Sequence, residues 1–179
     1  KFSNMSDRSG VSLDASVGYL FYSDYSNLNY LTGQASLDAK YLTSSRFNFY
    51  LKNAFIRSDD PRERELFSTA EDNKYVLATE TQRAVYMRNV VEPTVEYQFG
   101  PESRVGVRYR NNYYRAEDLE DRDSIENYIS PFLTVWLNKQ HGFQLDYGYT
   151  NGHFEASPDL NGHRISGAYM LRFTPKATA

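Results

Sequence analysis

The chain has no cysteine in its 179 residues, so disulfide bonds, thiolate zinc sites and cysteine nucleophiles are excluded. It has no excess of basic charge either: 20 Lys and Arg stand against 23 Asp and Glu, a net charge of -3. That balance excludes nucleic-acid binding through a general basic field. Mean hydropathy is -0.67, and no apolar run approaches the ~20 residues of a transmembrane helix, which excludes helical membrane proteins.

Aromatic residues are, in contrast, abundant. The chain contains 16 Tyr, 11 Phe and 1 Trp, which together make 16% of its residues. The length is sufficient for one domain with a real core. So many aromatic side chains in a chain of such polar average composition are unusual for a soluble domain.

Apolar and polar residues alternate along most of the chain. Between 11 and 21, the odd positions are Val, Leu, Ala, Val, Tyr and Phe, while most even positions are polar or small. Alternation with period two gives a β-strand one apolar face and one polar face. We therefore expect an all-β protein with eight strands, at 11–22, 33–42, 46–57, 83–99, 104–115, 124–137, 142–153 and 163–173. In the interiors of these eight strands, away from their end residues, no odd position carries Asp, Glu, Lys or Arg.

The links between the strands alternate in length. Three links have about four residues, at 42–45, 100–103 and 138–141. The others are longer, at 23–32, 58–82, 116–123 and 154–162, and a helix N-cap at Asp59 followed by Pro61 predicts a short helix in one of them. The short turns thus lie at one end of consecutive antiparallel hairpins and the long loops at the other.

Two architectures share this pattern. A soluble lipocalin-like calyx turns its apolar face inward and would bind an apolar ligand, whereas an outer-membrane barrel turns that face toward lipid. Short turns at one rim and long loops at the other favour the membrane barrel. Aromatic residues at both ends of the apolar face are typical of its two interfacial girdles: Tyr41, Phe47, Phe99, Phe143 and Phe173 near the short turns, and Tyr19, Phe21, Phe55, Tyr113 and Tyr149 near the long loops. The sequence therefore predicts an antiparallel up-and-down transmembrane β-barrel with odd residues outward.

The polar face would place eight basic and six acidic residues in the lumen. They are Asp14, Asp38, Lys40, Lys52, Arg88, Glu92, Glu96, Arg104, Arg108, Arg110, Glu126, Asp146, Arg164 and Arg172. An eight-stranded barrel has room only for side chains, so there the charges would form a paired network. In a larger barrel they would line an aqueous channel, with Arg104, Arg108 and Arg110 as a basic stripe suited to anionic solutes or sugars.

Two turn segments carry a resemblance to a known group of proteins. They are Tyr41-Leu42-Thr43-Ser44-Ser45-Arg46-Phe47 and Leu171-Arg172-Phe173-Thr174-Pro175-Lys176. The chain resembles Gram-negative outer-membrane β-barrels, and these turns are similar to those of barrels found beside exopolysaccharide and PEP-CTERM-type systems. The resemblance implies a bacterial outer-membrane location, contact with outer-membrane lipid and lipopolysaccharide, and a porin-like channel or scaffold for transport of a polysaccharide or small solute.

The two ends of the chain divide it into three parts. We expect a periplasmic N-terminal lead at 1–10, the barrel domain at 11–173 and a periplasmic turn or tail at 174–179. The alternation that ends at Phe173 resembles the terminal assembly signal of complete barrels. Thr174-Pro175-Lys176-Ala177, however, matches the short turns, which lead into a further strand. The sequence leaves both an eight-stranded barrel and a larger one open.

An outer-membrane lipid-modifying enzyme is the rival functional class. A Ser/His/acid centre is conceivable from Ser157, His153, His163, Ser166 and Glu155. However, His163 and Ser166 fall on opposite faces of a strand, and the histidines lack zinc-ligand spacing with acidic partners. We therefore expect a protein without a catalytic centre, metal site or cofactor.

Overall fold

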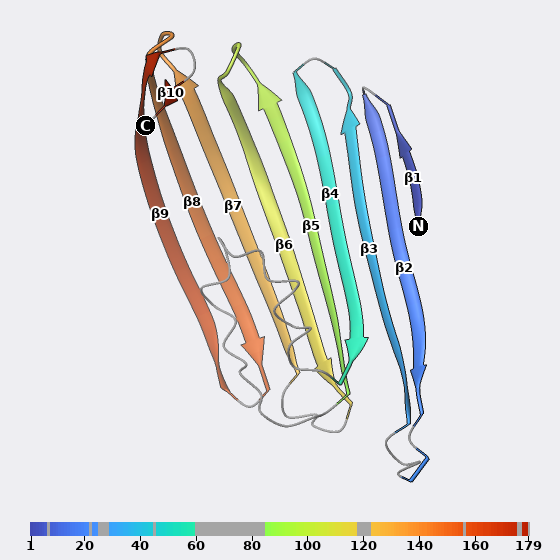
Figure 1. Cartoon of the computed structure of the whole chain (residues 1–179). Helices are drawn as coiled ribbons and strands as arrows, with labels where there is room; N and C mark the ends of the chain where they lie inside the picture. Colours follow the sequence, from blue (N-terminus) through green and yellow to red (C-terminus); the bar gives the residue numbers. More distant parts are fainter. Residues whose placement is uncertain are drawn as a thin grey trace.

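The computed structural model describes residues 1–6, 8–21, 23–24, 29–44, 46–59, 85–117, 123–155, 157–174 and 177–178. They form one antiparallel sheet in which each of ten strands pairs with the next along the chain (Figure 1). The strands are β1 (Phe2–Met5), β2 (Ser9–Leu20), β3 (Tyr30–Leu42), β4 (Phe47–Ser58), β5 (Tyr86–Gln98), β6 (Arg104–Ala116), β7 (Ser124–Trp136), β8 (His141–Phe154), β9 (Ser157–Thr174) and β10 (Ala177–Thr178). No helix among these residues is long and apolar enough to cross a membrane.

The eight expected strands correspond to β2–β9, which confirms the all-β, up-and-down arrangement. Two short strands were not expected: β1 falls in the predicted N-terminal lead and β10 in the predicted tail. The expected loop at 154–162 is also shorter, because β9 begins at Ser157 and Asn161 pairs with Asn151 of β8. The short helix predicted to begin at Asp59 falls, apart from Asp59 itself, outside the described residues.

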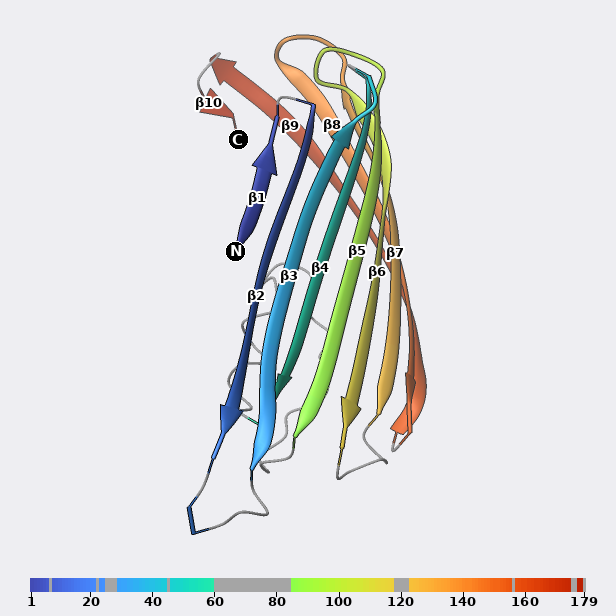
Figure 2. The same ribbon diagram turned by 90° about the vertical axis from the view of Figure 1, so that its right-hand side faces the viewer.

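The sheet is strongly curved but open. Figure 1 shows the N-terminal and C-terminal strands at opposite sides of the sheet, and Figure 2 shows the curvature between them. No pairing joins β1 or β2 to β9 or β10 among the described residues. The closed eight-stranded form of the predicted barrel is therefore not present, and the described strands make an open trough.

The two faces of the sheet differ sharply in chemistry. Of the exposed large apolar side chains, all but Phe2 and Leu20 occupy odd positions, including Val17 at 77% and Ile165 at 74% exposure. Buried polar side chains lie almost entirely at even positions, among them Arg88, Asn112 and Ser130. The sheet therefore exposes its apolar face and buries much of its polar face, which is the reverse of a soluble domain.

Candidate functional site: the polar concave face

The even face lies on the inside of the curve. Asn48 of β4 and Met170 of β9 line one groove of about 400 Å³ together with residues of the strands between them. A second groove, of about 430 Å³, is formed mainly by even residues of β6–β9. All fourteen predicted lumen charges occupy even positions of β2–β9, so the structure places them together on this concave face.

Several of these charges are paired across neighbouring strands. Arg104 lies 3.7 Å from Glu96, and Arg110 lies 3.7 Å from Glu92. Near the long-loop end, the side chain of buried Arg88 donates to Asn112 Oδ1 at 2.8 Å. Asn112 in turn donates through Nδ2 to Glu126 at 3.0 Å, so part of the predicted network exists.

Other predicted charges have no such contact. Asp38 lies opposite Lys52 in the β3–β4 ladder, and Lys52 lies opposite Glu92 in the β4–β5 ladder. Neither pair approaches to ion-pair distance, and Asp14 and Lys40 form no ion pair with any described residue. Of these charges near the N-terminal edge, Asp14, Asp38 and Lys52 are exposed and Lys40 is half-buried.

A bidentate ion pair on this face includes a residue that the sequence did not indicate. Arg172 of β9 donates to both carboxylate oxygens of Glu102, at 3.1 and 2.8 Å. Glu102 belongs to the short turn between β5 and β6, so curvature brings together elements 70 residues apart. Hydrogen bonding from Arg172 holds the pKa of the Glu102 carboxyl below its usual value.

Aromatic rings on the concave face lie over glycines of the neighbouring strand. A Cβ atom at Gly106 would lie 2.5 Å from the ring of Phe132, and one at Gly142 would lie 2.9 Å from the ring of Trp136. At Gly148, it would lie 2.7 Å from the hydroxyl of Tyr128. These three glycines therefore leave the space that the rings occupy.

Arginines lie over the same three rings. The Arg108 guanidinium carbon is 4.8 Å from the centroid of the Phe132 ring, and that of Arg172 is 4.4 Å from the Trp136 ring. Arg110 lies 5.5 Å from the Tyr128 ring. Cation–π attraction holds each guanidinium near its ring, so the face carries three glycine–aromatic–arginine stacks.

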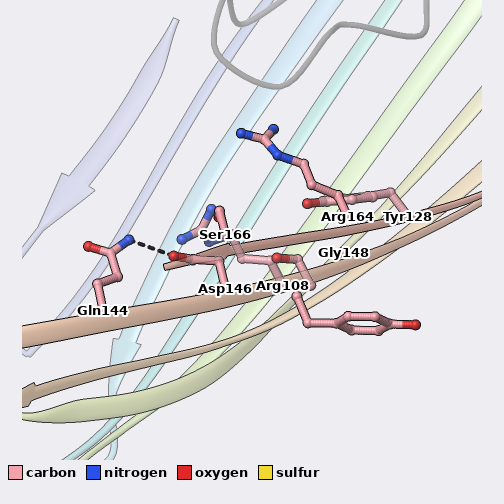
Figure 3. Close-up of a pocket in the computed structure, with 9 residues that line it drawn as sticks. Arg108, Tyr128, Gln144, Asp146, Gly148, Arg164 and Ser166 are labelled. Atoms are coloured by element: carbon pink, nitrogen blue, oxygen red, sulfur yellow. Dashed lines mark hydrogen bonds between the residues drawn. The ribbon is translucent and has the colours of Figure 1, made fainter. Parts of the chain in front are cut away.

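One groove combines a stacked arginine with a second arginine. Arg108, Tyr128, Gln144, Asp146 and Arg164 contribute to the 430 Å³ groove. Figure 3 shows the Gln144 amide directed at Asp146, with which it forms a 2.7 Å hydrogen bond. This groove offers guanidinium donors, a carboxylate acceptor and hydroxyl groups within one polar depression.

The ten residues predicted to form aromatic girdles share the outer face. All ten girdle residues occupy odd positions, and Tyr19, Phe21, Tyr41, Phe99, Phe143 and Phe173 are exposed. Near the short turns, Phe47 packs edge-on to Phe49 at 4.9 Å and also contacts Tyr97, while Phe143 contacts Tyr169 at 5.2 Å. Phe49, Tyr97 and Tyr169 extend this aromatic group beyond the predicted residues.

A row of asparagines crosses the same outer face. Along the hydrogen-bonding direction, paired residues from β2 to β9 are Leu13, Leu37, Asn53, Val91, Asn111, Asn127, Asn151 and Asn161. The amides bond to one another, with Asn111 donating to Asn127 at 2.9 Å and Asn151 donating to Asn161 at 2.9 Å. Four of the five asparagines in this row therefore bond to one another in pairs on an otherwise apolar face.

The residues of the rival catalytic hypothesis do not assemble into a triad. His153 contacts Asp159 at 2.7 Å and His163 contacts the Tyr147 hydroxyl at 2.7 Å, all on the outer face. Ser166 instead lines the concave groove, and no hydrogen bond joins a described serine to either histidine. Ser157 and Glu155 are exposed beside the β8–β9 link. The described residues contain no group of three or more His, Asp or Glu side chains that could hold a metal ion.

Comparisons of the chain with protein-family models, with curated proteins and with solved structures find no match.

Proposed function

We propose that the chain forms the wall of a β-barrel in a bacterial outer membrane and serves as a non-enzymatic channel or scaffold for passage of a solute or polysaccharide. The supporting observation is the apolar band on the outer face. Its side chains are exposed over nearly the full width of the sheet, as expected for a surface that lipid covers. The turn segments that resemble barrels of exopolysaccharide systems agree with this role.

The slope of the band is a quantitative test of this interpretation. Leu13 and Leu171 are each the second outward apolar residue from the short-turn end of their strands, β2 and β9. If the directly paired residues are followed from strand to strand, the row that begins at Leu13 ends at Asn161 of β9. Asn161 lies ten residues before Leu171 along β9. Ten residues span roughly 33 Å, and seven strand spacings span roughly 34 Å. The band thus crosses the strands at about 45°, as required when strands tilt by about 35–45° in a membrane barrel.

The polar concave face supports the choice of class. A calyx for an apolar ligand needs a mainly apolar lining inside the curve. Here the inside has one small buried apolar cluster, Ile56, Tyr86, Tyr114 and Ala116, but it also carries all fourteen charges, and the exposed outside is apolar. A lipid-modifying enzyme needs a nucleophile beside its base, whereas Ser166 and His163 lie on opposite faces. Both alternatives therefore have less support than the channel or scaffold.

The open edges bear on the size of the barrel. β1 pairs with only residues 10–13 of β2, and β10 pairs with only the end of β9. Because backbone groups must be satisfied within the hydrocarbon layer, a membrane-spanning sheet needs further strands on these edges. We therefore favour a barrel larger than eight strands, in which water hydrates the concave charges.

The experiment that tests the proposal is reconstitution into lipid vesicles and a planar bilayer. We expect the chain within its barrel to insert and to give discrete conductance steps if it forms a channel. A scaffold would insert without conductance. A protein that remains in the aqueous phase without detergent would refute the membrane assignment, and lipid hydrolysis lost in His153→Ala or His163→Ala would favour the enzyme.

A further inference from the structure

The groove between Arg108 and Arg164 has features of a specific binding site. We propose that it binds the carboxylate-bearing unit of an acidic saccharide. This inference rests on the proposed passage of a saccharide along the concave face and names the chemical class of that saccharide. Four observations carry it: the spacing of the two arginines, their lack of an ion pair with any described acidic residue, the stacking of Arg108, and the single carboxylate beside them.

The two arginines flank a floor of small residues. Arg108 of β6 pairs with Ser130 of β7, and Gly148 of β8 pairs with Arg164 of β9. The register on either side of Pro131 places Ser130 level with Gly148. Arg108 and Arg164 therefore lie three strand spacings apart, about 14 Å between their backbones. Their long side chains can converge on a ligand above Ser130, beside the Tyr128 ring that covers Gly148.

Both guanidinium groups are available to a ligand. The neighbouring Arg104, Arg110 and Arg172 each contact a glutamate, whereas Arg108 and Arg164 are exposed and form no ion pair with any described residue. Arg108 is nevertheless held in place, because its guanidinium lies 4.8 Å from the Phe132 ring. A planar guanidinium fixed in this way suits bidentate bonding to a carboxylate.

The remaining groove residues favour a sugar acid over a simple inorganic anion. Asp146 places one negative charge beside the two positive ones, so the local excess is a single positive charge, which matches one carboxylate better than a phosphate dianion. The bond from Gln144 uses Asp146 Oδ2 and leaves Oδ1 to accept a sugar hydroxyl. Tyr128 and Ser166 add hydroxyl groups at the same groove.

Calorimetric titration of the detergent-solubilised protein tests the proposal. The probes are a trisaccharide of uronic acid, the corresponding neutral trisaccharide and inorganic phosphate. We expect the uronate to bind most tightly and Arg108→Gln and Arg164→Gln each to weaken it about tenfold, the loss expected for one charge-assisted contact. Lys52→Gln, which removes the same charge from β4 of the same face, should change the affinity less than twofold.

Each alternative outcome has a distinct meaning. The proposal would be overturned if the uronate does not bind, if the neutral trisaccharide binds equally well, or if Lys52→Gln weakens binding equally. Equal binding of phosphate would overturn the saccharide assignment and show a general anion site. Arg108→Lys keeps the charge and the fold but loses the planar fork, so it should bind with intermediate affinity; unchanged affinity would overturn the bidentate contact. The titration uses no bilayer, so it is independent of membrane insertion. If the protein binds uronate but fails to insert into a bilayer, only the proposed function is rejected.

Discussion

Because the apolar band crosses the strands obliquely, we expect two residues of the same row of paired residues and the same face to lie at different depths in the membrane. Val17 pairs with Gly33, and the row continues through Arg57 and Met87 to Arg115 of β6. Val17 lies near the middle of the outward apolar run of β2, whereas Arg115 lies beyond the apolar run of its own strand. Both side chains are exposed, at 77% for Val17 and 51% for Arg115.

The expected depth difference follows from the tilt. Four strand spacings of ~4.8 Å separate the two residues, and a band at about 45° to the strands places them about 14 Å apart in depth. Half of an apolar band ~25 Å tall is about 12 Å. If Val17 lies near the bilayer midplane, Arg115 must therefore lie just outside the hydrocarbon layer.

Single-cysteine variants measure this difference directly, because the chain has no other cysteine. In vesicles, we expect Val17→Cys to be protected from a membrane-impermeant thiol reagent and Arg115→Cys to react at the rate of an exposed thiol. After unfolding in denaturant, the two should react equally, which serves as the control. Equal reactivity of both in folded, vesicle-bound protein would refute the oblique band and the membrane orientation derived from it.

Three further predictions concern the two faces and one turn. On the outer face, Leu145→Arg and Leu37→Arg should each make folding into vesicles less favourable by about 2–4 kcal/mol. On the opposite face, Gln144→Arg and Ser36→Arg should be tolerated. Equal effects of the two pairs would contradict the assignment of the faces. Gly106→Ala should lower the free energy of unfolding in denaturant by about 1–3 kcal/mol, because the new Cβ would lie 2.5 Å from both the Val95 carbonyl oxygen and the Phe132 ring. Gly162→Ala is the control: its Cβ would have its nearest contact at 3.9 Å, so the free energy of unfolding should hardly change. Because the folded-state pKa of Glu102 is lowered, its ion pair with Arg172 should stabilise the fold fully above the ordinary pKa of 4.5, and this stabilisation should be lost as the pH falls through the folded-state pKa. Glu102→Gln should flatten that part of the curve of stability against pH. An unchanged curve would contradict the role of this ion pair.

The alternation of residues was sufficient to predict the sheet and its faces. Period-two patterning depends only on neighbours along the strand, so β2–β9 and the sides taken by the fourteen charges followed from it. β1 and the start of β9 were missed because Phe2–Met5 and Ser157–Gly162 have no apolar alternation and pair through their backbones. Closure of the barrel was expected from the pattern alone, but no local pattern determines which strands form its edges.

The concave site could be predicted only in part. Its charged residues are evident from position, but their partners depend on register and curvature. Glu102 meets Arg172 across 70 residues, which no local spacing predicts. The glycines beneath the rings of Phe132, Trp136 and Tyr128 are present in the sequence, yet their role depends on which strand lies beside them. Once a register is assumed, an aromatic residue directly opposite a glycine on the polar face is a signal that could have found the stacks at Gly106 and Gly142, whereas Tyr128 reaches Gly148 diagonally.

The glycine–aromatic stacks also bear on how the sheet assembles. Phe132 lies directly opposite Gly106, between the pairs Arg108–Ser130 and Arg104–Thr134, and Trp136 lies directly opposite Gly142. A slip of two residues, which keeps each side chain on its own face, would move the Phe132 ring from a glycine onto an arginine and leave the space above Gly106 empty. The alternation of polar and apolar residues cannot oppose such a slip, whereas the fit of ring to glycine can. The β6–β8 segment, which holds three of these fits, is thus the part of the sheet where a misaligned hairpin would be least stable, and it can serve as the template on which the neighbouring strands align.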